Sequence, residues 1–567
     1  KTNMKLTLRP YLLLVILLVL LGSCSKKANV PVPADAAVVI HFNGSSLNSK
    51  LSWDEFKQGE LYKLAYEEVK DDLARKILDN PDSSGVDIKS DAFFFLRARA
   101  NGSGYASFTC LLKDEKAFTN AMSKLHERSE VTKAGNLSLI KLGNDGVLTW
   151  DSKRFVFIGY IASMNPAAPG FKYNEGNVSS DTLLKFANEV YDIKGSSSIA
   201  SNAKFASMMK EDGDAHFWLN PGSLYSGSLG SVLMMLPKAG ALFQGNFTAS
   251  TLNFANGKIT VDAKSYVNKE LSELYKKYSM KNLDADVLKK IPAGEIDAAF
   301  AMNYPPEGLK AFLSLLGVDG LVNVYLAELG YSIDDFIKAN KGDIVVSVSD
   351  FAITEKEKKY DMGAGIDPQV YKSKSPEAKI LFATSVNDKA SFDKLMGLLQ
   401  SKVIAEGGPM VQSVADKIPY QLKDNWFVAG SDSAHIHSFG NTSTNHSFIS
   451  KISGHPMGGF IDIQKFITGA RPSMGDSTAL LVSDESLKFW QDVVFYGGGG
   501  GSDAMESHLE VNLVDQTGNS LKQLHSYLGR IAKLFKDAED KRKAEWENSD
   551  MKAQADSVMV APPATGK

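Results

Sequence analysis

The chain has 567 residues, of which 44% are hydrophobic and 23% charged, as is typical of a folded globular protein. Its 63 lysine and arginine residues nearly balance its 66 aspartate and glutamate residues, so the composition predicts no basic surface and no nucleic-acid partner. Neither the nucleophile motif G-x-S-x-G nor the phosphate-binding motif G-x-x-x-x-G-K-[ST] occurs, and no catalytic residue or cofactor is predicted.

The beginning of the chain predicts export. Residues 11–21 form an uninterrupted apolar run that follows Lys5 and Arg9 and ends just before Gly22-Ser23-Cys24. Such a run is too short for a permanent membrane span and is typical of a signal peptide, here residues 1–23. The sequence Leu-Gly-Ser-Cys also resembles the lipobox of bacterial lipoproteins. That resemblance implies that Cys24 is acylated and becomes the first mature residue; a soluble exported protein cleaved elsewhere is the alternative.

The resemblance to lipoproteins also implies a location. Ser25 follows the cysteine where aspartate would favour retention in the inner membrane, so the outer membrane is expected. Lys26 and Lys27 stand where an acidic signal for surface export would lie. We therefore expect a lipid-anchored protein on the periplasmic face, held in the bilayer through acylated Cys24, with the cell surface as the alternative. Residues 24–32 form a tether stiffened by proline.

Beyond the tether, four segments of the first half have counterparts in the second half, in the same order. The pairs are 32–47 with 291–313, 105–125 with 380–399, 201–210 with 444–453, and 254–267 with 495–515. This order predicts an internal duplication that gives two homologous tandem domains, residues 33–285 and 288–550. The expected arrangement is a pseudo-two-fold pair or a tandem pair with a groove between the domains. Residues 551–567 lack periodicity and are predicted to be disordered.

Local patterns predict an α+β fold in each domain, with a mainly antiparallel sheet and helices packed on one face. Residues 138–160 alternate as a three-stranded meander, and Asn256-Gly257 is typical of a tight hairpin turn. Amphipathic helices are expected at 56–78, 115–126, 306–316, 318–329, 389–405 and 520–548. The apolar stripe of the last helix is expected to dock on the sheet of the second domain, with a groove on a partner protein as the alternative.

Candidate chemistry is sparse. His435 and His437 are two residues apart on an expected strand, so they would share one face and form a weak candidate for a metal site. A third ligand is not evident, and exposed polar residues around a hairpin are the alternative. Cys110 lies in an apolar stretch and is interpreted as a small buried residue without a reactive role.

The lipobox, the proline-containing tether and the repeated proline, alanine, acid and strand pattern resemble a lipoprotein family of Bacteroidota that is classed as a domain of unknown function. This resemblance implies location and architecture, and it transfers no active-site residue. We therefore expect a non-enzymatic binding or assembly module of the outer membrane, with an outer-membrane protein as a candidate partner. The alternative is an envelope hydrolase or carbohydrate-handling enzyme, which would gather His216, His435 and His437 in a cleft between the domains.

Overall fold

The computed structural model describes residues 30–69, 72–99, 103–125, 130–143, 146–161, 178–225, 238, 240–360, 369–404, 412, 418–440, 446–499 and 503–559. The described strands form one 18-stranded sheet in which neighbouring strands run antiparallel, as the alternating sequence patterns predicted. The strands are β1 (Val38–Phe42), β2 (Ala92–Ala98), β3 (Gly104–Leu111), β4 (Thr132–Ala134), β5 (Leu137–Leu142), β6 (Gly146–Trp150), β7 (Arg154–Ile161), β8 (Ala215–Leu219), β9 (Phe247–Ala255), β10 (Lys258–Tyr266), β11 (Ala298–Asn303), β12 (Asn340–Tyr360), β13 (Gln369–Val386), β14 (Tyr420–Lys423), β15 (Trp426–Gly430), β16 (Met457–Asp462), β17 (Trp490–Gly499) and β18 (Ala504–Leu513).

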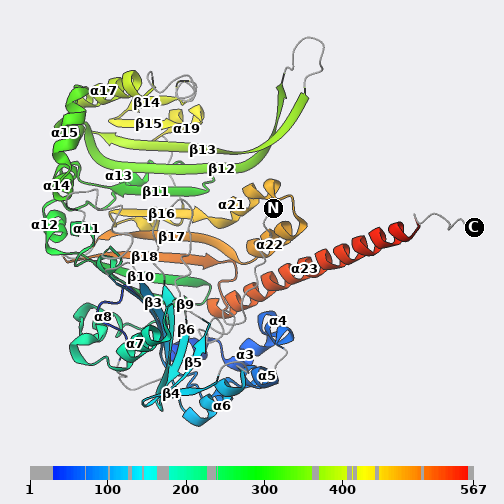
Figure 1. Cartoon of the computed structure of the whole chain (residues 1–567). Coiled ribbons are helices and arrows are strands. Elements are labelled where there is room, and N and C mark those ends of the chain that lie inside the picture. Colours follow the sequence, from blue (N-terminus) through cyan, green and yellow to red (C-terminus); the bar gives the residue numbers. More distant parts are fainter. Residues whose placement is uncertain are drawn as a thin grey trace, which may run out of the picture.

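The order of strands is the same in the two halves of the chain for eight strands, and the first half adds β4 and β5 at its outer end. In the first half the strands lie in the order β4-β5-β6-β7-β3-β2-β1-β8-β9-β10. In the second half the order is β14-β15-β13-β12-β11-β16-β17-β18. The last strands of the halves, β10 and β18, pair antiparallel from Lys258↔Asn512 to Tyr266↔Ala504. The halves therefore share one continuous sheet (Figure 1).

Helices connect the strands at both ends of the sheet and pack on its faces. They are α2 (Gly44–Lys50), α3 (Trp53–Gln58), α4 (Glu60–Glu68), α5 (Asp72–Asp79), α6 (Glu115–Leu125), α7 (Ser180–Tyr191), α8 (Ala203–Met208), α9 (Pro221–Tyr225), α11 (Gly240–Phe243), α12 (Lys269–Lys277), α13 (Ala285–Leu288), α14 (Pro306–Leu316), α15 (Asp319–Glu328), α16 (Ile333–Ala339), α17 (Lys389–Leu398), α19 (Ser433–Ser438), α20 (Ile449–Ile452), α21 (Ile463–Ala470), α22 (Ser477–Leu487) and α23 (Ser520–Met559). Short 3₁₀ turns η1 (Pro81–Ser84), η2 (Gly195–Ser197), η3 (Ile199–Ser201) and η5 (Arg471–Ser473), and the π turn η4 (Leu399–Ile404), complete the connections.

Helices cover both faces of the sheet in the first half, so the prediction of one covered face is wrong. Strand β2 is apolar on both sides: Phe93 and Phe95 pack against α7 and α8, whereas Ala92 belongs to the core under α3 to α6. A strand that is apolar in consecutive positions must be covered twice. We name the two sides the α7 face, which carries Val39 and Val345, and the α3 face, which carries Ile40 and Val346.

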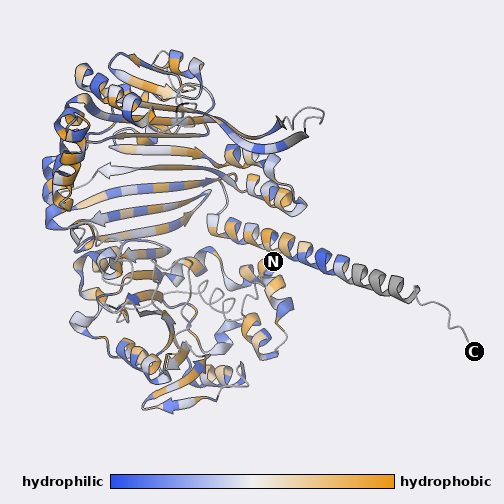
Figure 2. Cartoon of the chain, turned by 45° about the horizontal axis from the view of Figure 1, so that its top comes forward, coloured by the Kyte–Doolittle hydropathy of each residue, from blue (hydrophilic) through white to orange (hydrophobic). Residues whose placement is uncertain are grey.

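The last helix, α23, crosses to the first half of the chain. It contacts α4 and α22, and His525 Nε2 lies 3.1 Å from the carbonyl oxygen of Phe56 in α3. Tyr527 of α23 also stacks on Phe489 and lies edge to face against Trp490 of β17, so the helix contacts the sheet of the second half as predicted but docks on the first half as well. Beyond its docked turns α23 extends away from the sheet and becomes hydrophilic (Figures 1 and 2). It is helical to Met559, so residues 551–559 of the predicted disordered tail are helical, and 560–567 lie outside the described residues.

The docking of α23 depends on a close approach at Gly59, the residue between α3 and α4. A Cβ atom at Gly59 would lie 2.1 Å from His525 Nε2, which is far inside van der Waals contact. We expect Gly59→Ala to loosen the docked turns of α23, measured as faster amide hydrogen exchange over residues 521–531. Gly320→Ala, in α15 with no atom within 4 Å of the added Cβ, is the matched control and should leave that exchange unchanged. Equal exchange in both variants would contradict the prediction.

Candidate functional site

The predicted lipidation site, Cys24, lies outside the described residues, which begin at Val30. From Val30 onward the chain is held beside η3 at the start of β1. Ser198 Oγ donates a hydrogen bond of 2.9 Å to the Val30 carbonyl oxygen, and the Ile199 amide donates one of 3.0 Å to that of Val32. The point at which the predicted tether reaches the folded body is therefore fixed.

The weak metal candidates, His435 and His437, lie on helix α19 and not on a strand. Residues two apart on a helix point to different sides, so the expectation of a shared face is wrong. Asp432 caps this helix by accepting a hydrogen bond of 2.9 Å from the His435 amide, and His437 Nδ1 lies 2.6 Å from the Ser433 carbonyl oxygen. The segment expected to be a strand is a helix, and Asp432 stabilises the start of that helix as its N-cap. Within the described ranges, no three His, Cys, Asp or Glu side chains are arranged to hold a metal ion.

His216 is buried in the first half beside a histidine that the sequence did not single out. It lies opposite His41 on the neighbouring strand, with 3.0 Å between the two Nδ1 atoms. His41 Nε2 is 3.3 Å from Asp91 Oδ1, and His216 Nε2 is 3.1 Å from the Glu211 carbonyl oxygen. Burial, and then the charge of His41, lower the pKa of His216. No local signal could have found this pair, because it depends on the pairing of β1 with β8.

The structure does not bring His216 together with the histidines of α19. Helix α19 contacts β14 and β15, at the far end of the second half, whereas His216 is on β8. At the usual strand spacing the two places are on the order of 40 Å apart across the sheet. The cleft that the enzyme alternative required, with His216, His435 and His437 in it, is not formed by these residues.

Cys110 is buried on β3, as predicted. Burial raises the pKa of its thiol to about 11, and Ser90 Oγ lies 3.3 Å from the sulfur. A thiol with so high a pKa is almost entirely protonated at neutral pH and is a poor nucleophile.

The most extensive unusual surface is an apolar band on the α3 face of the central sheet. Directly opposite residues on neighbouring strands align into two rows that cross the strands, and neither row contains a polar side chain. The first row is Phe382, Val346, Phe300, Gly459, Phe495, Leu509, Val261, Leu252 and Ala215. The second row is Ile380, Val348, Ala298, Ile461, Val493, Val511, Ile259 and Phe254.

The band is accessible along its length. Ile380 and Phe382 are 49% and 39% exposed on β13, and Ile461 and Leu509 are each 37% exposed further along the rows. At about 4.8 Å per strand the first row is roughly 40 Å long. The described helices α3 to α6 lie beyond β1 and α17 lies beyond β13, while α21 and α22 contact the central strands β12 and β17. Contiguous exposed apolar surface of this size is typical of a binding site.

A glycine lets aromatic rings pack across the middle of the band. Gly459 lies between Phe300 and Phe495 in the first row, and the two rings stack with their centroids 6.2 Å apart. A Cβ atom at Gly459 would lie 2.5 Å from Phe495 Cζ, so a larger residue would push this ring away. The band is therefore continuous because this position has no side chain.

The opposite side of the same strands is polar where the two halves join. Buried Glu510 of β18 accepts hydrogen bonds from Lys258 Nζ of β10, at 2.7 Å, and from Lys451 Nζ. His508 Nδ1 lies 2.7 Å from Asp262 Oδ1 across the same pair of strands. Burial alone would raise the pKa of Glu510, but the two lysines outweigh burial and hold the pKa at about 2. The joint between the halves, which is the pairing of β10 with β18, thus has ion pairs on one face and apolar side chains on the other.

This low pKa predicts acid sensitivity of the joint. The folded pKa lies below the ordinary value of 4.5, so the ion pairs contribute fully above pH 4.5 and their contribution is lost as the pH falls toward 2. We expect Glu510→Gln to lower the free energy of unfolding by about 1 to 2 kcal/mol at neutral pH and to flatten its fall below pH 4.5, measured by urea unfolding. Glu506→Gln, an exposed position on the same face of β18, should change neither quantity.

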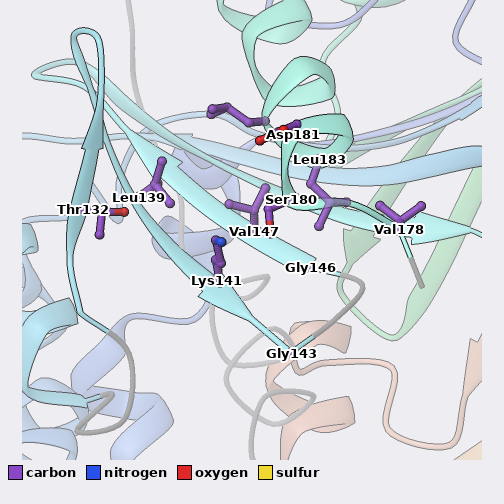
Figure 3. A pocket seen from close by; sticks show the side chains of 11 residues that line it. Thr132, Leu139, Lys141, Gly143, Gly146, Val147, Val178, Ser180, Asp181 and Leu183 are labelled. Carbon is purple, nitrogen blue, oxygen red and sulfur yellow. The ribbon is translucent and has the colours of Figure 1, made fainter. Parts of the chain in front are cut away.

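A separate cavity of about 470 Å³ lies between β5, β6 and the start of α7 (Figure 3). Leu139, Val147 and Leu183 form apolar walls, and Lys141 and Asp181 contribute polar groups. Because Leu139 and Val147 belong to the core under α7, this cavity is on the α7 face and is distinct from the band.

Among the described helices, none alone has the length and hydropathy to cross a bilayer. Helices α14 and α15, which meet at an angle of 117°, have that length and hydropathy only as a pair.

Comparison with known proteins identifies a family of unknown function. No curated protein matches the sequence. Solved structures with some similarity include crystal forms III, IV and I of TP0453, at 11%, 12% and 10% identity and TM-scores of 0.24, 0.24 and 0.23. These matches cover 46–47% of this chain and 88–90% of TP0453, and TM-scores so low transfer neither fold nor function. The family described as domain of unknown function DUF4836 matches residues 28–348, more than half of the sequence, and the chain belongs to this family.

Proposed function

We propose that this protein is a lipoprotein of the outer membrane, anchored on the periplasmic face through acylated Cys24, that binds lipid hydrocarbon without catalysing a reaction. The lipobox at residues 21–24, Ser25 after the cysteine and the likeness to Bacteroidota lipoproteins support the anchor and the location. The anchor itself would place the folded body next to a source of lipid.

The observation that carries the binding role is the apolar band. Its two rows cross the central strands with no side chain that donates or accepts a hydrogen bond, and the backbone groups beneath are paired within the sheet. A protein interface of this extent would ordinarily include about one hydrogen bond per 100–200 Å². A hydrocarbon chain needs none, and its burial against Phe382 or Leu509 is favourable through the hydrophobic effect alone.

We further infer that the halves are homologous repeats, residues 33–285 and 288–550, of one duplicated α+β unit. The order of eight strands that the two halves share supports this inference. So does the position of the four sequence matches. Three of them include strands with the same place in the two orders, such as β3 and β13, and the match of 201–210 with 444–453 includes α8 and α20, which precede β8 and β16. The antiparallel pairing of β10 with β18, its counterpart, is what a pseudo-two-fold arrangement requires.

The binding role is tested by asking what stays with the purified protein. Full-length protein extracted in mild detergent is expected to carry phospholipid, detected by solvent extraction and mass spectrometry. The double variant Phe382→Gln and Leu509→Gln should lose most of that lipid, because each amide would sit unpaired against hydrocarbon. Thr260→Gln, on the opposite face of β10, is the control and should retain it.

Two results would overturn the proposal. Equal lipid content in the band variant and the control would place the lipid elsewhere on the molecule. A stoichiometric protein partner or a dimer that is lost only in the band variant would identify the band as a protein interface, as the predicted outer-membrane partner would require.

A further inference from the structure

Helix α15 presents an apolar face that the rest of the described protein does not cover. It has no buried residue, and Leu321, Val324 and Tyr325 are 74%, 62% and 63% exposed. These three positions have the i, i+3, i+4 spacing that places side chains on one side of a helix. Asp319 and Glu328, at its ends, are the only charged residues of the helix. Such exposure of large apolar side chains on a helix is unfavourable in water unless the helix meets a partner.

The strand register places α15 at the same edge of the sheet as the tether. Each antiparallel pairing aligns the beginning of one strand with the end of the next. Followed from strand to strand, these pairings bring the beginning of β1 and the end of β11 to the same edge. The other strand termini at this edge are the ends of β8, β10 and β17 and the beginnings of β9, β18 and β16. The chain enters β1 from Val30 at this edge, and α14 and α15 follow the end of β11. Figure 1 accordingly draws α15, α14 and α12 along one flank.

The opposite edge is built differently. The long helix α23 follows the end of β18 there, and the hairpin of β12 and β13 extends beyond the sheet on that side (Figure 1). Both project away from the flank that carries α15, in Figure 1 and in the turned view of Figure 2. The body thus has an edge where the tether joins and an edge from which its longest elements extend.

We propose that the α15 edge rests on the bilayer in which Cys24 is anchored, with Leu321, Val324 and Tyr325 inserted among the lipids. This inference rests on the proposed anchor. The six steps along the chain from Cys24 to Val30 span at most about 20 Å when fully extended, so the acylated end cannot be far from this edge. An amphipathic face of this kind lies in the boundary between head groups and acyl chains. Tyr325 is suited to that depth, since its ring is apolar and its hydroxyl is polar.

The exposed lysines of α12 fit the same orientation. Lys276 and Lys277 are exposed at the end of α12, which packs on α14, and the ammonium group of Lys277 lies over the ring of Tyr278. Cations beside an inserted apolar helix are attracted to anionic head groups. The bilayer is therefore an occupant that matches the apolar face of α15 and the lysine pair at the end of α12, whose acidic residues Glu270 and Glu273 lie further from that end.

The test uses the full-length acylated protein in vesicles of phosphatidylethanolamine and phosphatidylglycerol. Cys24 and Cys110 are the only cysteines of the chain, so an introduced cysteine gives a unique reactive site once Cys24 is acylated and Cys110 is buried. Val324→Cys carries an environment-sensitive fluorophore on α15, and Trp546→Cys, on the projecting part of α23 and 74% exposed in the native protein, is the matched control. We expect a quencher attached to the acyl chains to reduce the emission at position 324 several-fold more than at 546.

The outcomes separate this inference from the proposed anchor. Protein that does not float with the vesicles would overturn the anchor and the bilayer contact together. Protein that floats, but is quenched equally at 324 and 546, would overturn the contact of α15 and leave the anchor in place. A label at position 324 that is already shielded without vesicles would assign α15 to a protein interface instead. Leu321→Ser with Tyr325→Ser should reduce quenching at 324 while flotation is unchanged.

Discussion

Replacing Cys24 by alanine is expected to abolish permanent attachment of the protein to the membrane. Each buried CH₂ group of an acyl chain contributes about 0.8 kcal/mol to membrane attachment, so several chains on one cysteine make it effectively permanent. Without the thiol no thioether to diacylglycerol can form, and the contact of α15 alone would leave only reversible binding. The measurement is incorporation of labelled palmitate together with fractionation of membranes from soluble contents.

The second cysteine supplies the control. Cys110→Ala removes a buried thiol of the core of β3, so it should alter stability slightly and leave both palmitate incorporation and membrane location unchanged. If the Cys24→Ala protein remained in the membrane fraction after washing in high salt, the lipobox interpretation would be wrong.

Removing the side chain of Trp150 is expected to produce the largest loss of stability among single substitutions in the first half. This residue is fully buried under α6, its ring meets that of Phe118 edge to face at 5.4 Å, and Nε1 donates a hydrogen bond of 2.9 Å to Thr119 Oγ1. Trp150→Ala leaves a cavity between sheet and helix and should lower the free energy of unfolding by about 3 to 5 kcal/mol. Urea unfolding followed by circular dichroism measures the loss.

Trp546→Ala is the matched control, because it deletes the same side chain from an exposed position on α23. Its effect should remain within about 0.5 kcal/mol. A loss below about 1 kcal/mol for Trp150→Ala would mean that α6 closes onto the sheet after the deletion, contrary to the rigid packing that the aromatic contacts indicate.

The local elements could be predicted because their signals lie within a few residues. The expected helix at 306–316 is observed as α14 with the same bounds, and Asn256-Gly257 forms the turn between β9 and β10, with Gly257 at φ +68°. Ser332 accepts a hydrogen bond from the Asp335 amide at the start of α16, a capping contact between residues only three positions apart. The single helix expected at 56–78, however, is broken twice: extended backbone at Gly59 separates α3 from α4, and α4 ends before Val69, ahead of α5.

The arrangement in space could not be predicted from the same signals. Alternation showed that Ile259 and Val261 share one side of β10, but the rows of the apolar band exist only because nine strands pair in a particular register. The His41–His216 contact joins residues 175 positions apart, and the docking of α23 on α3 joins residues 469 positions apart. Periodicity records which side of an element is apolar and carries no information about which element covers it.

The pairing of β10 with β18 makes the order of synthesis matter. When the first half has left the ribosome, β10 has β9 on one side and an open edge of hydrogen-bonding groups on the other. Its partner strand is made almost 240 residues later. Until then the nascent molecule carries the kind of edge that recruits strands from other chains. The first half alone is thus more prone to aggregate than the complete protein. Once the second half has folded, β18 pairs with β10 and no open edge is left on that strand.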